Sequence, residues 1–219
     1  MVVVWIKSAS RYRLNSHNAM NLNAIDVVVR EIPTDDSTLF AGLSDEERAY
    51  ASQLAAGRRR EWVAWRALLH EQTGRWALSE SALRVAYAES GEPIFEGIEG
   101  SISVTHSRRY VALARTCEGR CGVDIEQLDR NFERIENKYI SDTERTLTSA
   151  ADQRFRAVVW CAKEAAYKCL GRSGVDFRRD LRIAEVDFEG GRVQIEAFDR
   201  LLEGSIRWLD GAVLVAVRA

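Results

Sequence analysis

The sequence predicts an α+β fold with antiparallel sheets and long helices, arranged as two similar halves that are related by a pseudo-twofold axis. Three observations lead to this prediction: short runs of alternating hydrophobicity, two long amphipathic segments, and a helix-capping motif that occurs twice. The halves are expected to span residues 1–118 and 119–219, with a ligand cleft between them.

The capping motif is a Ser followed three residues later by a Glu, as in Leu43–Arg48 (LSDEER) and Ile140–Arg145 (ISDTER). It predicts the start of a helix, because the Ser hydroxyl and the Glu carboxylate each satisfy a backbone N–H of the first turn. A longer amphipathic segment with Trp follows each motif, at Arg58–Glu71 and Gln153–Leu170. The motifs lie 97 residues apart but the matching Trp residues lie 95 apart, so two unrelated capped helices are the alternative interpretation.

Short runs of alternating hydrophobicity predict the strands. Ser101–Thr105 and Tyr110–Arg115 are expected to form a hairpin, and Cys121–Glu126 follows as a further strand. Turns at Glu189–Gly191 and Asp210–Gly211 indicate two more hairpins. Their strands are expected at Leu181–Phe188, Arg192–Phe198, Ser205–Leu209 and Ala212–Arg218. No Gly-rich phosphate loop follows any strand, which argues against the P-loop and dinucleotide-binding classes.

Charge and hydropathy bound the function. The 31 basic and 33 acidic residues give a net charge of −2, which does not support a general nucleic-acid binder. The longest apolar runs, Val2–Ile6 and Ala212–Val217, are far shorter than the ~20 residues of a membrane span. The first run is also too short for a signal-peptide core. We therefore expect a cytoplasmic protein without a membrane or nucleic-acid partner.

Two carboxylates share one face of the predicted strand in Gly122–Glu126 (GVDIE), because alternate residues of a strand point the same way. Val123 and Ile125 face one side, and Asp124 and Glu126 face the other. An exposed edge strand would tolerate the repulsion between the carboxylates, whereas a strand that leads into a cleft would need a cation between them. Oxygen ligands suit magnesium, manganese or calcium rather than zinc.

The predicted helix Gln153–Leu170 places Trp160, Glu164 and Lys168 on one flank, at positions i, i+4 and i+8. Its apolar stripe consists of Phe155, Val158, Val159, Ala162, Ala165, Ala166 and Cys169. Glu164 and Lys168 are either a surface ion pair or a third metal ligand and a phosphate ligand. Three converging carboxylates without a cation would have raised pKa values, and a divalent ion removes that penalty. The residues thus predict a magnesium–pyrophosphate site without a P-loop.

His106 begins a turn after the first hairpin strand, with Arg108 close behind it. It is either a core or capping residue, or a phosphate donor assisted by the N–H groups of the turn. Arg58 and Arg66 belong to a basic edge of the first long helix, which is either solvated or binds a second phosphate. A Ser–His–Asp hydrolase is poorly supported, because the sequence has no GxSxG motif.

Together these motifs resemble the 4′-phosphopantetheinyl transferases of the broad-specificity, surfactin-synthetase-activating type. The resemblance rests on Gly122–Glu126 (family pattern G-[VI]-D-x-E), Trp160–Lys168 (W-x-x-K-E-[AS]-x-x-K) and Thr105–Ser107 (S-H-S). Order and spacing both fit, and Tyr139–Leu147 resembles the helix that the family places between its two main motifs. The length matches the two-halved monomeric type, which implies a monomer.

The resemblance implies an enzyme that moves phosphopantetheine from coenzyme A to a Ser of an acyl, peptidyl or polyketide carrier protein, with magnesium, and releases 3′,5′-ADP. Asp124, Glu126 and Glu164 would hold the metal. Glu164, Lys168 and Asp124 would form the catalytic set, with Glu164 as the general base. Coenzyme A would contact Arg58, Arg66, Gly91, Pro93, Thr105, His106, Ser107, Arg108, Lys163 and Lys168.

Two departures from the family pattern stand out. Glu92 replaces the Lys that the family often has in a G-K-P loop, so Arg108, Arg66 or Arg58–Arg60 must hold the 3′-phosphate instead. Thr105 replaces the usual Ser but keeps the hydroxyl. Two other functions stay open: a magnesium-dependent pyrophosphohydrolase that acts on a free nucleotide such as coenzyme A, and a non-catalytic interaction module with a solvated GVDIE strand.

Overall fold

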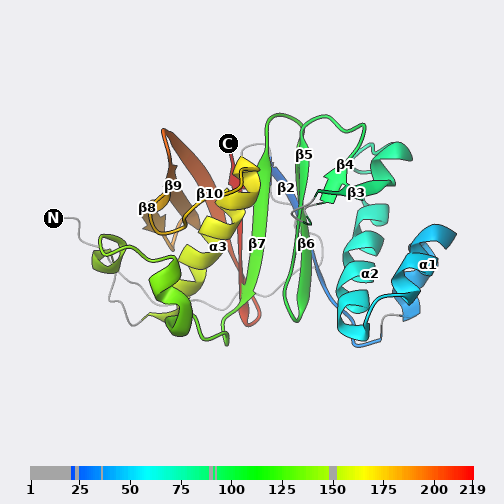
Figure 1. Ribbon diagram of the computed structural model, residues 1–219, viewed down its shortest axis with the longest axis horizontal. Coiled ribbons are helices and arrows are strands. Elements are labelled where there is room, and N and C mark those ends of the chain that lie inside the picture. The colour runs from blue at the N-terminus through cyan, green and yellow to red at the C-terminus, as the bar shows by residue number, and fades with distance from the viewer. Residues whose placement is uncertain (1–20, 23–24, 36, 89–90, 92, 148–151) are drawn as a thin grey trace.

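Two antiparallel sheets lie side by side in the molecule, and a long helix packs beside each of them (Figure 1). The structure is a computed structural model that describes residues 21–22, 25–35, 37–88, 91, 93–147 and 152–219. The apolar run Val2–Ile6 and the departure at Glu92 lie outside these residues. Helices and antiparallel strands together confirm the predicted α+β class.

The first sheet has the order β1-β2-β6-β5. These strands are β1 (Asn21–Leu22), β2 (Ile25–Glu31), β6 (Tyr110–Thr116) and β5 (Ser101–His106). The predicted hairpin is present, with Ser101 opposite Thr116 and His106 opposite Val111. A separate two-stranded sheet pairs β3 (Val85–Tyr87) with β4 (Pro93–Phe95). The sequence analysis did not predict β1, β2, β3 or β4.

The second sheet has the order β7-β11-β10-β9-β8. Its strands are β7 (Cys121–Gln127), β11 (Ala212–Arg218), β10 (Arg200–Leu209), β9 (Arg192–Ala197) and β8 (Leu181–Asp187). All five were predicted, but β10 begins at Arg200 rather than Ser205. The β9–β10 turn is made by Phe198 in a left-handed conformation, with φ 56°, followed by Asp199. Because this turn contains no Gly or Pro, and Asp199 is its one residue of a type common in turns, its sequence carries only a weak turn signal.

The helices are α1 (Asp45–Ser52), α2 (Ala56–Glu71) and α3 (Gln153–Leu170). The bounds of α3 are those predicted, because Asp152 caps its start and Gly171 ends it in a left-handed conformation. All seven residues of the predicted apolar stripe are buried. Short 3-10 turns are Ser37–Gly42, Ser81–Leu83, Glu133–Lys138 and Glu144–Thr146. No helix in the described ranges is long and apolar enough to cross a membrane.

The two capping motifs fold differently. Ser44 caps α1 with the reciprocal Ser–Glu bonds that were predicted. Ser141 and Glu144 make the same two bonds, but only a 3-10 turn follows, instead of the expected helix over Tyr139–Leu147. The reason is that the Glu144 side chain is buried and also accepts the N–H of Ile183, which ties this segment to β8.

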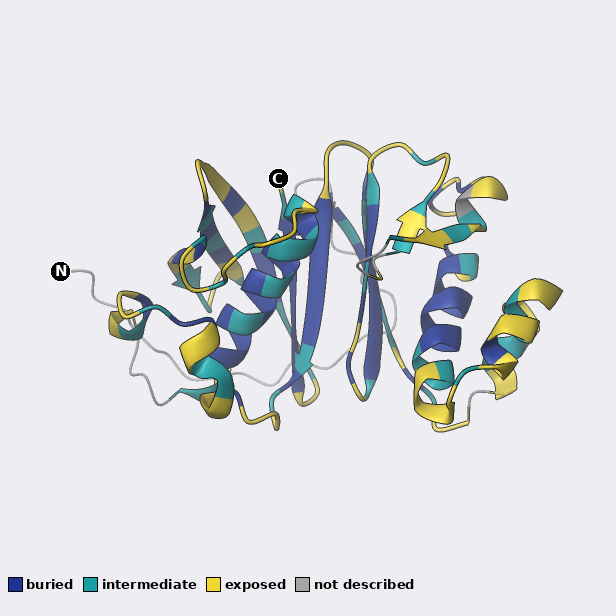
Figure 2. Cartoon of the chain, in the orientation of Figure 1, coloured by how far each residue is buried: buried dark blue, intermediate teal, exposed yellow. Residues whose placement is uncertain are grey.

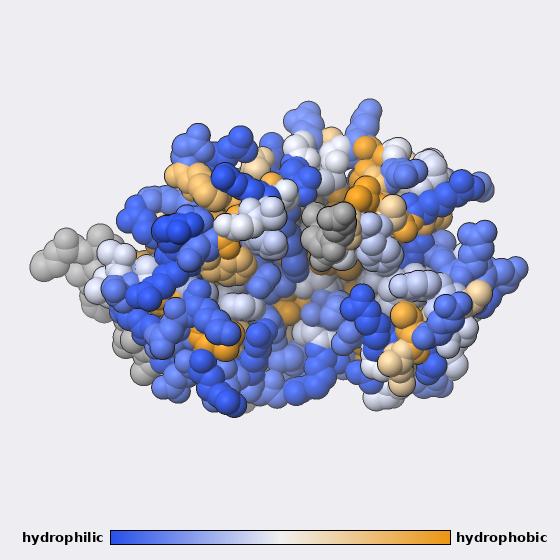
Figure 3. All heavy atoms as spheres, in the orientation of Figure 1, coloured by the Kyte–Doolittle hydropathy of each residue, from blue (hydrophilic) through white to orange (hydrophobic). Residues whose placement is uncertain are grey.

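A shared core joins the two sheets. It contains Val27 and Ala112 of the first sheet with Val123, Ile125 and Leu214 of the second. Buried residues therefore run through β6, β7 and the inner sides of α2 and α3 (Figure 2), while hydrophilic side chains cover most of the face in Figure 3. The predicted boundary at 118/119 falls between the sheets, and the division into two similar halves stays a prediction.

Side-chain hydroxyls connect the neighbouring strands β5 and β7. Alternate residues of β5 and the turn after it form this hydroxyl row: Ser101, Ser103, Thr105 and Ser107. The N–H groups of Cys121 and Val123 donate to Ser101 and Ser103 at 2.8 and 3.1 Å, and Gln127 Nε2 donates to Ser107 at 3.1 Å. These bonds set the register between the strands that carry most of the candidate site.

Candidate functional site

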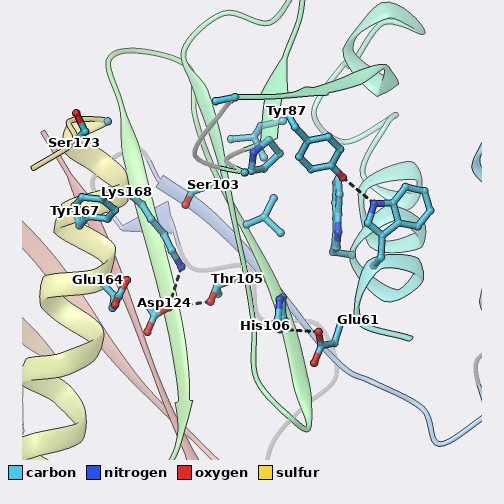
Figure 4. Close-up of a pocket in the computed structure, with 18 of the residues that line it drawn as sticks. Glu61, Tyr87, Ser103, Thr105, His106, Asp124, Glu164, Tyr167, Lys168 and Ser173 are labelled. Atoms are coloured by element: carbon cyan, nitrogen blue, oxygen red, sulfur yellow. Dashed lines mark hydrogen bonds and ion pairs between the residues drawn. The ribbon is translucent and has the colours of Figure 1, made fainter. Parts of the chain in front are cut away.

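A cavity of about 650 Å³ lies between the elements of the two sheets (Figure 4). Its walls come from α2, β3, β4 and β5 on one side and from β7 and α3 on the other. Eight of the predicted site residues line it: Arg58, Gly91, Pro93, Thr105, His106, Asp124, Glu164 and Lys168. Residues from both sides of the predicted boundary thus meet in one cavity.

Asp124 is held at one oxygen and left without a partner at the other. Lys168 Nζ donates to Oδ1 at 2.9 Å, and the Thr105 hydroxyl donates to the same oxygen at 3.0 Å (Figure 4). Lys168 also donates to the Val123 carbonyl at 2.9 Å. Oδ2 is buried and has no hydrogen-bond partner among the described residues. A buried carboxylate oxygen without a partner is costly, so this oxygen fits a cation that is bound in the cavity.

Gly122 allows α3 to approach β7 closely. A Cβ at this position would lie 1.9 Å from the Ala165 carbonyl oxygen and 2.7 Å from the Cys169 nitrogen. Any side chain would therefore push the helix away from the strand. This close approach explains the Gly of the GVDIE motif, because it brings Lys168 of the helix to Asp124 of the strand.

Glu126 and Glu164 both lie close enough to Asp124 for its charge to affect their ionisation. Burial and the Asp124 charge raise the pKa of Glu126 to about 7. The same two causes raise the pKa of Glu164 above its usual value. Burial is the larger cause for both residues, and repulsion from Asp124 adds to it.

The three carboxylates do not form a ready-made ligand cluster. No group of three or more His, Cys, Asp or Glu side chains in the described part of the chain is arranged to hold a metal ion. Glu126 does not line the cavity, because it accepts Trp160 Nε1 at 2.9 Å and forms an ion pair with Arg130. Asp124 and Glu164 do line it. Two carboxylates completed by water and phosphate oxygens are an ordinary ligand set for Mg²⁺, so the residues fit the ion.

The opposite wall of the cavity carries the cation Arg58 and the carboxylate Glu61, which was not predicted from the sequence. His106 Nδ1 lies 3.7 Å from a carboxylate oxygen of Glu61 (Figure 4). Burial lowers the pKa of His106, and Glu61 opposes this effect. Arg58 lies one helical turn before Glu61 on α2 and also lines the cavity. The i, i+3 spacing of Arg58 and Glu61 is the signal that could have placed both on one face of the helix.

An aromatic wall was also missed. Trp62, Trp65 and Tyr87 line the cavity, and Trp62 Nε1 donates to the Tyr87 hydroxyl at 2.8 Å. Tyr167 of α3 lines the other side. The spacing of the two Trp residues after Arg58, at i+4 and i+7, would have placed all three on one face of α2.

Two predicted cations lie outside the cavity lining. Arg66 is buried against α1, where Nε donates to Glu47 at 2.6 Å and the guanidinium also binds the Leu83 carbonyl. Lys163 is fully buried and forms an ion pair with Glu144 at 2.7 Å. Its Nζ also donates to two backbone carbonyls. Helical spacing alone could not show that both cations already have buried carboxylate partners.

Ser107 and Arg108 also lie outside the cavity lining. Ser107 is buried and accepts hydrogen bonds from Gln127 and from the Tyr110 N–H. Arg108 is exposed and forms an ion pair with Asp129 at 2.6 Å. Both residues therefore have partners within the chain, whereas their neighbours Thr105 and His106 face the cavity.

Comparison with known proteins supports the chemistry of this site. Residues 120–213 match the family model described as the 4′-phosphopantetheinyl transferase superfamily. No curated protein matches the chain. The matched segment contains Asp124, Glu126, Glu164 and Lys168, which come from β7 and α3. This segment of the chain, which carries both main motifs, is therefore similar to the phosphopantetheinyl transferase superfamily.

Proposed function

We propose that this protein transfers the 4′-phosphopantetheine group of coenzyme A to a Ser of an acyl, peptidyl or polyketide carrier protein, with magnesium, and releases 3′,5′-ADP. One observation carries the proposal: Asp124 and Lys168, from two distant motifs, meet beside Glu164 in a cavity, and one buried Asp124 oxygen has no partner among the described residues. The family match at residues 120–213 supports phosphopantetheinyl transfer in general.

Asp124 and Glu164 would hold the magnesium ion, with Glu126 two residues further along β7 as an additional carboxylate. The bound ion supplies positive charge that neutralises the diphosphate and the leaving oxygen. The partnerless Oδ2 of Asp124 and the raised pKa values of Glu126 and Glu164 support this ligand set.

The phosphates of coenzyme A would lie between the two walls. Lys168 uses two of its three N–H groups on Asp124 and the Val123 carbonyl, which leaves one for a phosphate oxygen. Arg58 and His106 offer further donors from the opposite wall. Because Arg66 is engaged with Glu47, Arg58 is the α2 cation that we assign to the 3′-phosphate.

Proton transfer is assigned to Glu164. It lines the cavity beside Asp124 and Lys168, where its carboxylate would accept the proton of the carrier Ser hydroxyl. Lys168 would stabilise the negative charge that grows on the departing 3′,5′-ADP. We propose a cytoplasmic monomer, because the motifs and the length resemble those of the two-halved monomeric type.

The test is to incubate the protein with coenzyme A, Mg²⁺ and a panel of apo carrier proteins, and to measure the mass of each carrier. At least one carrier should gain one phosphopantetheine. Asp124→Asn should abolish the gain. Glu196→Gln should not, because the Glu196 side chain lies at the surface and pairs with Arg182 away from the cavity.

Two results would contradict the proposal. No mass gain with any carrier, while the folded protein binds coenzyme A, would exclude the transfer reaction. Consumption of coenzyme A without a carrier would favour the pyrophosphohydrolase instead.

A further inference from the structure

We propose that Thr105 acts as a positioning residue for Asp124, and that it does not bind the nucleotide directly. In this role its hydroxyl and the Lys168 ammonium both donate to Oδ1 of Asp124 and hold the carboxylate in one orientation for the metal ion. The inference rests on the proposed function and assigns Thr105 a role different from the nucleotide contact that the motif resemblance implies.

The Thr105 hydroxyl already donates its hydrogen bond to a residue of the same chain. A hydroxyl carries a single proton, and that of Thr105 is donated to Asp124 at 3.0 Å. Both residues are buried, with 5% and 7% of their surfaces exposed. Breaking this bond to bind a phosphate would leave Oδ1 with Lys168 alone and would loosen the carboxylate that the metal needs.

The two donors on Oδ1 fix the orientation of the carboxylate plane. Without them the carboxylate would rotate more freely about its Cβ–Cγ bond. Thr105 from β5 and Lys168 from α3 approach the same oxygen from different elements, as Figure 4 shows. A ligand group that is held in place in advance binds a metal with less loss of entropy.

The hydroxyl row explains why Thr105 lies opposite Asp124. The bonds from Cys121 and Val123 to Ser101 and Ser103 hold β5 and β7 in a fixed register. The next hydroxyl of the row then lies beside Asp124, so its position follows from the packing of the two strands and not from a ligand. The β-branched Thr side chain also has a restricted χ1 angle, which keeps the hydroxyl aimed at the carboxylate.

The test measures metal binding without turnover. Mn²⁺ binding to the full chain in the presence of coenzyme A, with no carrier, is followed by the electron paramagnetic resonance signal of free Mn²⁺. Thr105→Val removes the hydroxyl at nearly constant shape and should weaken Mn²⁺ binding about tenfold, because the lost bond is to a charged group. Thr105→Ser keeps the hydroxyl and should stay within about threefold of the wild type.

A matched control separates positioning from the general effect of a Thr-to-Val change. Thr146→Val removes a hydroxyl that donates to the Thr143 carbonyl at 2.7 Å, outside the cavity lining, and should leave Mn²⁺ affinity unchanged. Coenzyme A binding in EDTA, measured by calorimetry, should be the same for Thr105→Val and the wild type. A direct nucleotide contact would instead weaken it in the variant.

Each outcome has one meaning. Equal Mn²⁺ affinity of Thr105→Val and the wild type would overturn the inference and leave the proposed function intact. Failure of the wild type to bind Mn²⁺ with coenzyme A would overturn the proposed function itself. If Thr105→Val does not give a cooperative thermal transition, Thr105→Ala serves in its place, with the same expected loss.

Discussion

The α2 and α3 helices each hold a buried cation against the Glu of a capping motif, and the two ion pairs have the same spacing. Arg66 pairs with Glu47, and Lys163 pairs with Glu144. The residue numbers of the two partners differ by 19 in each case. Corresponding members of the pairs lie 97 residues apart, as the capping motifs do. The ion-pair residues thus keep the 97-residue spacing of the capping motifs, whereas the Trp residues do not. The shared spacing supports the predicted duplication.

The two pairs differ in how completely they are enclosed. The Glu47 side chain keeps 11% of its surface exposed and also binds His70. Lys163 and Glu144 are both 0% exposed, and they also bind the Tyr139 and Phe177 carbonyls and the Ile183 N–H. The more completely enclosed pair holds α3, where Glu164 follows Lys163 directly and lines the cavity. Holding α3 in one orientation about its axis suits Glu164, because this side chain must face a reacting group.

Lys163→Met should have the largest effect, because it leaves the Glu144 carboxylate buried without its cation. We expect the free energy of unfolding to fall by about 3–5 kcal/mol, measured by urea denaturation. Arg66→Met should cost about 1–3 kcal/mol, because Glu47 keeps 11% of its side chain exposed to water and its bond from His70, whereas Glu144 is fully buried. An equal or larger loss at Arg66 would contradict the difference drawn between the two pairs.

Gly122→Ala should have the next largest effect, because the new Cβ would overlap the backbone of α3. We expect a loss of about 1–3 kcal/mol in the free energy of unfolding, together with weaker Mn²⁺ binding, as Lys168 moves away from Asp124. Gly57→Ala on α2 is the matched control, since a Cβ at this position would have no atom within 4 Å. It should stabilise the protein by up to about 1 kcal/mol.

The metal-free protein should respond to pH in opposite ways in the two regions. Burial opposes ionisation of Glu47, but hydrogen bonds from His70 and the Ser44 N–H, with Arg66 beside it, lower its pKa to about 2. Its contribution is present above pH 4.5 and is lost as the pH falls toward 2. The pKa of Glu126 is raised to about 7, so its contribution is present below pH 4.5 and is lost as the pH rises through 7.

Urea denaturation in EDTA across this pH range, with Glu47→Gln and Glu126→Gln, measures both effects. Glu47→Gln should reduce the acid-side loss of stability, and Glu126→Gln should reduce the loss as the pH rises toward 7. If the stability of the wild type does not fall as the pH rises toward 7, Glu126 is ionised without a metal, which would contradict the effect of burial and the Asp124 charge on this residue.

The smallest effect is expected at the capping Ser residues. Ser44→Ala should cost about 1 kcal/mol in the free energy of unfolding, because α1 loses its cap. Ser141→Ala should cost less, since its bond to the Glu144 N–H is longer, at 3.3 Å, and only a 3-10 turn follows. Thermal denaturation of both variants checks the order, and a reversed order would mean that the second motif is more than a turn.

Local patterns were enough to predict most of the elements. The bounds of α3 follow from its 3.6-residue periodicity, the Asp152 cap and the Gly171 terminator. The turn at Phe198 was missed, because a left-handed non-glycine residue has no sequence signal. The strand pattern of β7 also placed Val123 and Ile125 in the core correctly.

By itself, the sequence determined the α+β class, the main strands and helices, and which side chains of β7 and α3 share a face, because these depend on spacing along the chain. Only the tertiary structure decided which charges reach the cavity: Arg58 and Lys168 do, whereas Arg66 and Lys163 are bound to buried carboxylates. The physical reason is that a charged side chain is placed by its partner, and these partners come from distant elements whose packing no local pattern specifies.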